Sequence, residues 1–352
     1  MGVKNVTYIL GAGASCKSQP LVSDMKVRME CLLLLLDTNS KIHINHICKT
    51  FKNKTKSLYV KYNPIVKEAI KHYTPDTYVK KLSLTGKTAD LDTFKEFLNL
   101  YFLFEQDNQQ ITYEKFPIYK PIWFIGPLSE EEKEKKSNFI WDKIKSPIDN
   151  RYDVFFATLL KKTGNMDNPQ LLLPSNYNII SWNYDNQLEH AYKEYSSGLN
   201  FIDIRKKLNI NSEYDANKSH IIKINGDCTC WDIKDNKELT LFTAIEKLVE
   251  GDSINTTIDF AWEDGKTVDD AVHKIIEATD KIVIIGYSFP NFNRDVDKII
   301  FSEYNPAINQ IIIQVPLKDE YEKIKERIKT IKNISDSVFI HISDADQFYI
   351  PL

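Results

Sequence analysis

Short runs of β-branched and other apolar residues recur along the chain and constrain its fold more than any other feature. They lie at 3–10, 177–182, 220–224, 281–285 and 309–315, with a last candidate at 337–342. Helical stretches separate most of them. Buried runs that alternate with helices are typical of a parallel sheet covered on both faces. The pattern predicts an α/β protein with a doubly wound, mainly parallel, Rossmann-like sheet.

The stretch from about residue 40 to 165 has a different character, because it is rich in Lys, Glu, Tyr and Phe. Its segment 90–106 spaces five apolar residues three or four positions apart, namely Leu91, Phe94, Phe97, Leu98 and Tyr101. Such a stripe is typical of a helix face buried in a core or an interface. We expect one domain over residues 1–352, with a helical insertion at about 40–165 after the first strand–helix unit.

Charge and cysteine content argue against several classes of protein. The net charge is only −3 and lysines are interspersed with acidic residues, so direct nucleic-acid binding is not expected. The five cysteines are scattered, which favours reduced thiols over a disulfide framework. Cys228 and Cys230 form a lone C-x-C, too few for a four-cysteine zinc site, and no metal is expected. Without a signal sequence or a membrane-length apolar run, the sequence predicts a soluble cytoplasmic protein.

Four of the predicted strands end in glycine or polar residues. In an open parallel sheet, ligands bind outside the carboxyl ends of the strands, so we expect these four ends to line one crevice. The four ends are 11–15 (GAGAS), 181–185 (SWNYD), 224–227 (INGD) and 286–290 (GYSFP).

The first of these ends is suited to a phosphate group. Small residues at 11–15 let backbone N–H groups approach a diphosphate, and a following helix would add its positive end. The same small residues are also common in turns that bind no ligand. The NAD dehydrogenase pattern further requires an acidic residue about 20 positions on, at the end of a second strand. Glu30 is near that spacing but lies in a predicted helix, with Ser23 expected as its cap, so an ordinary dehydrogenase is disfavoured.

The other ends carry side chains that suit a ribose. Asn183 and Asp185 are an amide and a carboxylate two residues apart, which can donate to and accept from hydroxyl groups. Equally, Asp185 can be a helix cap and Asn183 a turn residue. Gly286 would let the backbone approach a ligand, and Ser288 can hold a phosphate or ribose oxygen.

The ordered set GAGAS, SWNYD, INGD and IIGYSFP resembles the Sir2-like family, above all its branch in bacterial anti-phage defence. The segments DTYVKKL (76–82) and RYDVFFATLL (151–160) fit the same branch. The resemblance implies that Asn183 and Asp185 lie at the nicotinamide ribose of NAD. It also implies a set of residues that bind the diphosphate and the rest of the nucleotide: Gly11, Ala12, Gly13, Ala14, Ser15, Gly226, Gly286, Tyr287 and Ser288.

Two departures from the family pattern bear on the chemistry. The zinc-ribbon cysteines of protein deacetylases are missing, so deacetylation is not expected. Asn225 stands where the family usually has its catalytic histidine, and Asn does not titrate near neutrality and cannot act as a general base. His220 is expected roughly 16 Å away, at the far end of the same strand. His190 and His273 fall on predicted helices, where packed or solvated histidines are expected.

Simple hydrolysis of NAD requires fewer catalytic groups than deacetylation. Nicotinamide leaves as a neutral molecule, so the site must chiefly stabilise an oxocarbenium-like ribose and place a water. Asn183 and Asn225 would orient these groups, and Asp185 would offer negative charge. We therefore expect an NAD⁺ glycohydrolase that depletes NAD as the effector of a defence system. It would be triggered by a sister protein or by homo-oligomerisation through the insertion. The alternatives are a catalytically silent NAD- or ADP-ribose-binding subunit, and a structural subunit that binds no nucleotide.

Overall fold

The computed structural model describes residues 4–37, 51, 54–72, 74–106, 148–164, 170–196, 198–232, 238–260, 262–263, 270–302 and 310–351. The chain divides into two compact units. Unit 1 contains Met1–Ser15, Ile148–Asp227 and Asp259–Leu352, and unit 2 contains Cys16–Pro147 and Cys228–Ile258. Within the described ranges, no helix has the length and apolar character needed to cross a membrane.

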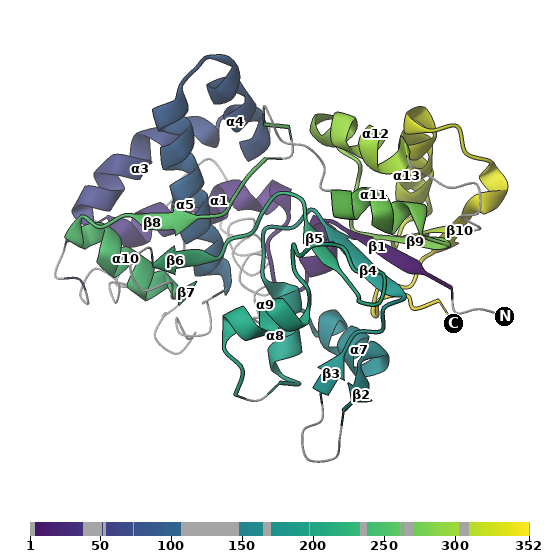
Figure 1. Ribbon diagram of the computed structural model, residues 1–352. Helices are drawn as coiled ribbons and strands as arrows, with labels where there is room; N and C mark the ends of the chain where they lie inside the picture. Colours follow the sequence, from purple (N-terminus) through teal and green to yellow (C-terminus); the bar gives the residue numbers. More distant parts are fainter. Residues whose placement is uncertain are drawn as a thin grey trace, which may run out of the picture. The chain divides into compact units, whose positions relative to one another are not determined.

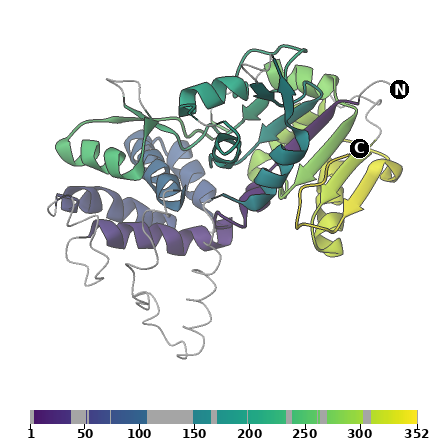
Figure 2. The same cartoon turned by 90° about the horizontal axis from the view of Figure 1, so that it is seen from below.

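Unit 1 is built on a six-stranded parallel sheet (Figure 1). Across the sheet the strands follow the order β11-β10-β9-β1-β4-β5. Their bounds are β1 (Val6–Leu10), β4 (Tyr177–Ser181), β5 (Ile221–Lys223), β9 (Lys281–Ile285), β10 (Gln310–Gln314) and β11 (Phe339–Ile342). Each neighbouring pair is parallel. Figure 2 shows β1, in purple, inside the sheet, with the yellow β11 at one edge. The α/β class and the six strands predicted from the sequence are confirmed.

The register of the sheet brings the ends of its central strands level with one another. Leu10 of β1 pairs with Ser181 of β4 and with Ile285 of β9, and Ser181 pairs with Lys223 of β5. From β1 the chain proceeds to β4 and β5 on one side, and it later returns to β9, β10 and β11 on the other. β1 and β9 therefore form the switch point of the sheet, where ligands of doubly wound proteins bind.

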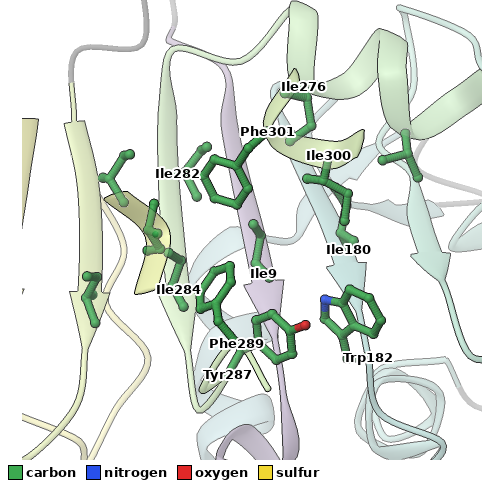
Figure 3. Close-up of a cluster of buried hydrophobic side chains, with 14 of the residues drawn as sticks. Ile9, Ile180, Trp182, Ile276, Ile282, Ile284, Tyr287, Phe289, Ile300 and Phe301 are labelled. Carbon is green, nitrogen blue, oxygen red and sulfur yellow. The ribbon is translucent and has the colours of Figure 1, made fainter. Parts of the chain in front are cut away.

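Helices cover both faces of this sheet, as the doubly wound prediction requires. On one face lie α11 (Asp270–Glu277), α12 (Arg294–Ser302) and α13 (Lys318–Ile331). Figure 3 shows part of the core that they share with the strands, including Ile9, Ile180, Ile282, Ile300 and Phe301. The other face is covered by α7 (Asn150–Leu159), α8 (Gln187–Lys193) and α9 (Phe201–Lys207). Because alternate strand residues enter two apolar cores, the strands appear in the sequence as mainly apolar runs.

Unit 2 is mainly helical. It contains α1 (Val22–Leu36), α3 (Lys56–Ala69), α4 (Pro75–Leu84), α5 (Thr88–Gln106) and α10 (Leu241–Glu250). A small antiparallel sheet joins β6 (Cys230–Asp232) to β7 (Glu238–Leu239) and β8 (Ile254–Thr256). All five residues of the apolar stripe on α5 are buried, so its predicted role in a core is confirmed. A buried ion pair joins α1 to α5, in which Arg28 donates to both carboxylate oxygens of Glu105, at 2.9 and 2.8 Å.

The bounds of unit 2 differ from those predicted for the insertion. Unit 2 begins at Cys16 and ends its first segment at Pro147, and it takes in a second segment, Cys228–Ile258. α7 lies within the predicted insertion but packs in the core of unit 1. The helical spacing of an amphipathic segment does not reveal which core receives its apolar face, so the pattern could not separate α7 from its neighbours. Of the predicted insertion, residues 40–50, 52–53, 73, 107–147 and 165 lie outside the described residues.

Two local features also differ from the sequence analysis. The residue at the N-cap of α1 is Leu21, and Ser23 lies inside the helix, with its hydroxyl 3.4 Å from the Asp24 carboxylate. The predicted Ser23 cap is therefore wrong. A short hairpin of β2 (Lys161–Thr163) and β3 (Gln170–Leu172) was not predicted, because neither strand is buried.

Candidate functional site

Three glycines bring two loops of unit 1 into backbone contact at the switch point. A Cβ atom added to Gly286 would lie 2.3 Å from the Ala14 amide nitrogen and 2.4 Å from the Gly13 Cα. One added to Gly11 would lie 2.6 Å from the Gly286 carbonyl oxygen, and one added to Gly13 would lie 2.7 Å from the Gly286 Cα. Gly286 also has a φ of +64°, which residues with side chains rarely adopt. Close packing therefore accounts for glycine at all three positions.

The same contact uses N–H groups that a diphosphate cradle would need. The Gly11 N–H donates to the Ile285 carbonyl at 3.0 Å, and the Gly13 N–H donates to the Gly286 carbonyl at 3.0 Å. The Ala14 N–H donates to the Gly11 carbonyl at 2.8 Å, within the 3₁₀ turn η1 (Ala12–Ser15). A diphosphate at this loop would meet the exposed Ala12 first. Diphosphate binding at this turn therefore stays a prediction.

Ser15 lies at the centre of a buried polar cluster. Its hydroxyl lies 3.1 Å from the Tyr152 hydroxyl of α7, and it accepts a hydrogen bond from the side-chain amide of Asn183 at 3.2 Å. It also hydrogen-bonds to the Asp185 carboxylate. Asn183 and Asp185 are 7% and 8% exposed. The structure thus brings together three of the predicted site residues and adds Tyr152. We call Ser15, Tyr152, Asn183 and Asp185 the Ser15 cluster.

The N-cap of α8 is Asn186 and not Asp185, but the preceding Asp185 accepts a hydrogen bond from the start of that helix. Its Oδ1 accepts the backbone N–H of Gln187, the first residue of α8, at 3.1 Å. Burial raises the pKa of the Asp185 carboxyl, whereas the Lys223 ammonium and the Gln187 N–H lower it. Support of the helix start accounts for the contact with Gln187, but it does not account for the contact between this carboxylate and Ser15.

α7 supplies two residues that the sequence analysis did not single out. Tyr152 joins the Ser15 cluster, and the buried Arg151 holds the loop beside it. The Arg151 guanidinium pairs with Asp149 at 2.6 Å and donates to the carbonyl oxygens of Gly13 and Ala14, both at 3.1 Å. The one sequence signal at these positions is the resemblance of segment 151–160 to the defence branch.

Asn225 lies beside the cluster and is anchored to the backbone. Its side-chain amide donates to the Trp182 carbonyl at 3.1 Å, and its own carbonyl accepts the Asp259 N–H at 2.9 Å. The next residue, Gly226, has a φ of +68°, as a tight turn after β5 requires. Asn225 therefore holds the peptide that leads directly into Asn183.

At the fourth strand end, 286–290, some residues are buried in the core and others are exposed. Tyr287 is buried, and its ring stacks on that of Trp182 with 5.0 Å between centroids (Figure 3). Phe289 is buried and has a φ of +53°, an uncommon backbone conformation for a bulky residue. Gly286 and Ser288 are exposed just beyond the carboxyl end of β9. A ligand at this end would contact these two residues, and the predicted contact with Tyr287 would have to come from its backbone.

The Tyr287 hydroxyl donates to a buried carboxyl group, Asp297 of α12, at 2.9 Å. Burial raises the pKa of Asp297 to about 8. From about pH 4, where an unfolded aspartate releases its proton, to about pH 8, the folded protein retains a proton that the unfolded chain has lost. We therefore expect stability to fall as pH rises through this window, by up to about 1.4 kcal/mol per pH unit from this group.

Urea unfolding of the wild type and of Asp297→Asn, at pH 5 and pH 8, measures this contribution. The variant keeps a neutral side chain at both values, so it should lose less stability between them than the wild type does. An equal loss in both proteins would show that Asp297 is already ionised in the folded state at pH 5.

The three histidines named in the sequence analysis lie on or next to secondary-structure elements of unit 1. His220 Nε2 lies 2.9 Å from the backbone oxygen of Asp215, and its ring stacks on Tyr214 at the end of β5 remote from Asn225. Burial lowers the pKa of His190 to about 4, so this side chain is neutral near pH 7. His273 lies on α11, as the helix prediction required.

Comparison with known proteins adds no assignment. No protein-family model and no curated protein matches this chain. Among the residues that the structure describes, no group of three or more His, Cys, Asp and Glu side chains is placed to hold a metal ion.

Proposed function

We propose that the chain cleaves the bond between nicotinamide and ribose in NAD⁺, at the carboxyl ends of β1 and β4, to give nicotinamide and ADP-ribose. The observation that carries this proposal is the Ser15 cluster, in which two hydroxyls, an amide and a carboxylate meet at one end of the sheet. Ribose hydroxyls both donate and accept hydrogen bonds, so Asn183 and Asp185 suit them. A bound ribose would replace the hydrogen bond between Asn183 and Ser15.

The proposed chemistry requires charge and orientation more than proton transfer. As nicotinamide leaves, the ribose gains positive charge at its anomeric carbon. The buried Asp185 offers a fixed negative charge to that carbon, in surroundings where water screens it little. Asn183 orients the ribose hydroxyls, and Asn225 holds Asn183 through the preceding peptide and helps to place the attacking water. Hydrolysis and cyclisation of the product share this first bond cleavage.

The rest of the nucleotide is proposed to lie along the neighbouring strand ends. The diphosphate would contact the turn formed by Gly11, Ala12, Gly13 and Ala14. The remaining contacts would come from Gly226, Gly286, Tyr287 and Ser288. The motif resemblance to Sir2-like defence proteins supports a wider proposal, in which the chain is a cytoplasmic NAD-depleting effector of bacterial anti-phage defence.

Such an effector must stay silent until it is triggered. We assign the binding of a partner, or oligomerisation, to unit 2.

A catalytically silent NAD- or ADP-ribose-binding subunit is the second candidate. The observation that favours it is Asn225, which does not titrate near neutrality and whose amide is engaged with the Trp182 carbonyl. In this case the strand ends would bind the nucleotide without cleaving it.

Nicotinamide release from NAD⁺ tests the proposed function. We expect the wild type to release nicotinamide and Asn183→Ala to lose this activity. We expect Asn225→His to release it faster, because a general base typically contributes about 10²–10⁴-fold. Thermal unfolding with and without NAD⁺ gives a second readout, since ligand at 100 times its dissociation constant adds about 2.7 kcal/mol of stability. A shift in stability without nicotinamide release would favour the silent subunit. If NAD⁺ caused no shift in stability and no nicotinamide were released, an NAD site would be excluded.

A further inference from the structure

Lys223 is a buried lysine with three acceptors around its ammonium group. Its side chain is 1% exposed, and Nζ lies 2.7 Å from Glu189 Oε1. The same nitrogen lies 2.9 Å from the backbone oxygen of Asp185 and 2.9 Å from Oδ1 of Asn186. An ammonium has three protons, so these three acceptors fix its orientation. Lys223 therefore holds the turn between β4 and α8, which carries Asn183 and Asp185.

Glu189 is shared between two cations. Its Oε1 also lies 2.9 Å from Arg205 of α9, which in turn lies 2.9 Å from Asp227. The four charges of Lys223, Arg205, Glu189 and Asp227 sum to zero. The Asp185 carboxylate is then an additional buried charge, and such a charge is costly unless neighbouring charges or hydrogen bonds stabilise it.

The groups that face Asp185 come from four elements. They are the Lys223 ammonium of β5, the Glu189 carboxylate and Gln187 N–H of α8, the Ser15 hydroxyl of η1 and the Tyr152 hydroxyl of α7. Beyond Tyr152, the Asp149–Arg151 ion pair is neutral as a whole. His190, on α8, is also neutral near pH 7. The nearby charges that favour one protonation state of Asp185 over the other are therefore those of Lys223 and Glu189.

Lys223 and Glu189 act on Asp185 in opposite senses, although they form one ion pair. Burial raises the pKa of Asp185 most, Lys223 lowers it, and Glu189 raises it. Removing either partner breaks the same 2.7 Å contact. A purely structural effect of breaking that contact would be similar in direction for both variants, whereas an electrostatic effect on Asp185 would differ in sign.

We propose that Lys223 is a positioning residue of the NAD-cleaving site, which holds Asp185 in place and keeps its carboxylate ionised against the opposing charge of Glu189. This inference rests on the proposed function. As pH falls, Asp185 gains a proton and no longer offers negative charge to the ribose, so nicotinamide release declines on the acid side. Loss of Lys223 moves this decline to higher pH, and loss of Glu189 moves it to lower pH.

The test compares Lys223→Met with Glu189→Gln. In each we measure kcat/KM for nicotinamide release against pH, and we titrate the ¹³C carboxyl resonance of Asp185, identified by its absence in Asp185→Asn. We expect the acid limb and the resonance midpoint to move up by about one pH unit in Lys223→Met and down by a similar amount in Glu189→Gln. Lys223→Arg keeps the charge and should stay near the wild type. Lys223→Gln, which keeps an N–H donor, replaces Lys223→Met if that variant does not fold.

The two readouts separate this inference from the proposed function. Opposite shifts of the Asp185 resonance support the role of Lys223 even if the wild type releases no nicotinamide, and then only the proposed function fails. Shifts of the same sign in both variants, or an unmoved resonance in both, overturn the inference whatever the rates are. Lys223 would then be a structural residue of the turn alone.

Discussion

We expect Asp185→Asn to lower the proposed release of nicotinamide by about 10²–10³-fold, a loss typical for removal of one group that stabilises transition-state charge. Asn is nearly isosteric with Asp and retains Oδ1, so it can still accept the Gln187 N–H that begins α8. The backbone oxygen of Asp185 that accepts from Lys223 is also unchanged. The variant therefore removes the negative charge and alters the hydrogen bonding with Ser15, but it leaves the start of α8 and the contact with Lys223 in place. Release of nicotinamide, followed by chromatography at saturating NAD⁺, measures the effect.

Asp185→Ala is the matched control, because it removes both the charge and the acceptor for the Gln187 N–H. We expect it to be as inactive as Asp185→Asn and less stable by about 1 kcal/mol, the usual cost of losing a side-chain acceptor at the start of a helix. If Asp185→Asn released nicotinamide as fast as the wild type while Asp185→Ala was merely unstable, Asp185 would only support the start of α8. The proposed chemistry would then lack its counter-charge.

The sheet of unit 1 was predictable because its strands are buried on both faces. Ile282, Val283 and Ile284 alternate between the two cores, so the strand appears in the sequence as an unbroken apolar run. The division into two units was not predictable in the same way. Segment 228–258 joins unit 2 mainly through α10, which packs against α3 and α5, and the helical spacing of α10 does not reveal which core receives its apolar face.

The Ser15 cluster was predictable only in part. Ser15, Asn183 and Asp185 follow recognisable strands, and parallel strands bring their carboxyl ends together. Tyr152 lies on a helix, 137 residues from Ser15, and its spacing on that helix is that of an ordinary core residue. Lys223 ends an apolar strand, where a lysine usually marks the surface. Only the structure shows that its ammonium has three buried acceptors.

We expect Gly286→Ala to destabilise the protein by roughly 2–5 kcal/mol, the sum of two separate costs. A left-handed backbone costs an alanine about 1–2 kcal/mol. The new methyl group would also lie 2.3 Å from the Ala14 nitrogen and 2.4 Å from the Gly13 Cα. These are backbone atoms that cannot rotate away, and overpacking of this kind costs about 1–3 kcal/mol or more. Urea unfolding monitored by circular dichroism measures the loss.

Gly198→Ala separates the two costs, because Gly198 also lies in unit 1 and has a φ of +86°, with nothing within 4 Å of its added Cβ. It should lose only the backbone contribution of about 1–2 kcal/mol. An equal loss in both variants would mean that the loops at Gly13 and Gly286 separate easily. In that case the N–H groups of Gly11 and Gly13 could be released from their carbonyl partners, and the turn could open to hold a diphosphate. A much larger loss in Gly286→Ala would instead mean that the loops are locked together, and the proposed NAD site would then be limited to the Ser15 cluster and the exposed side of the turn.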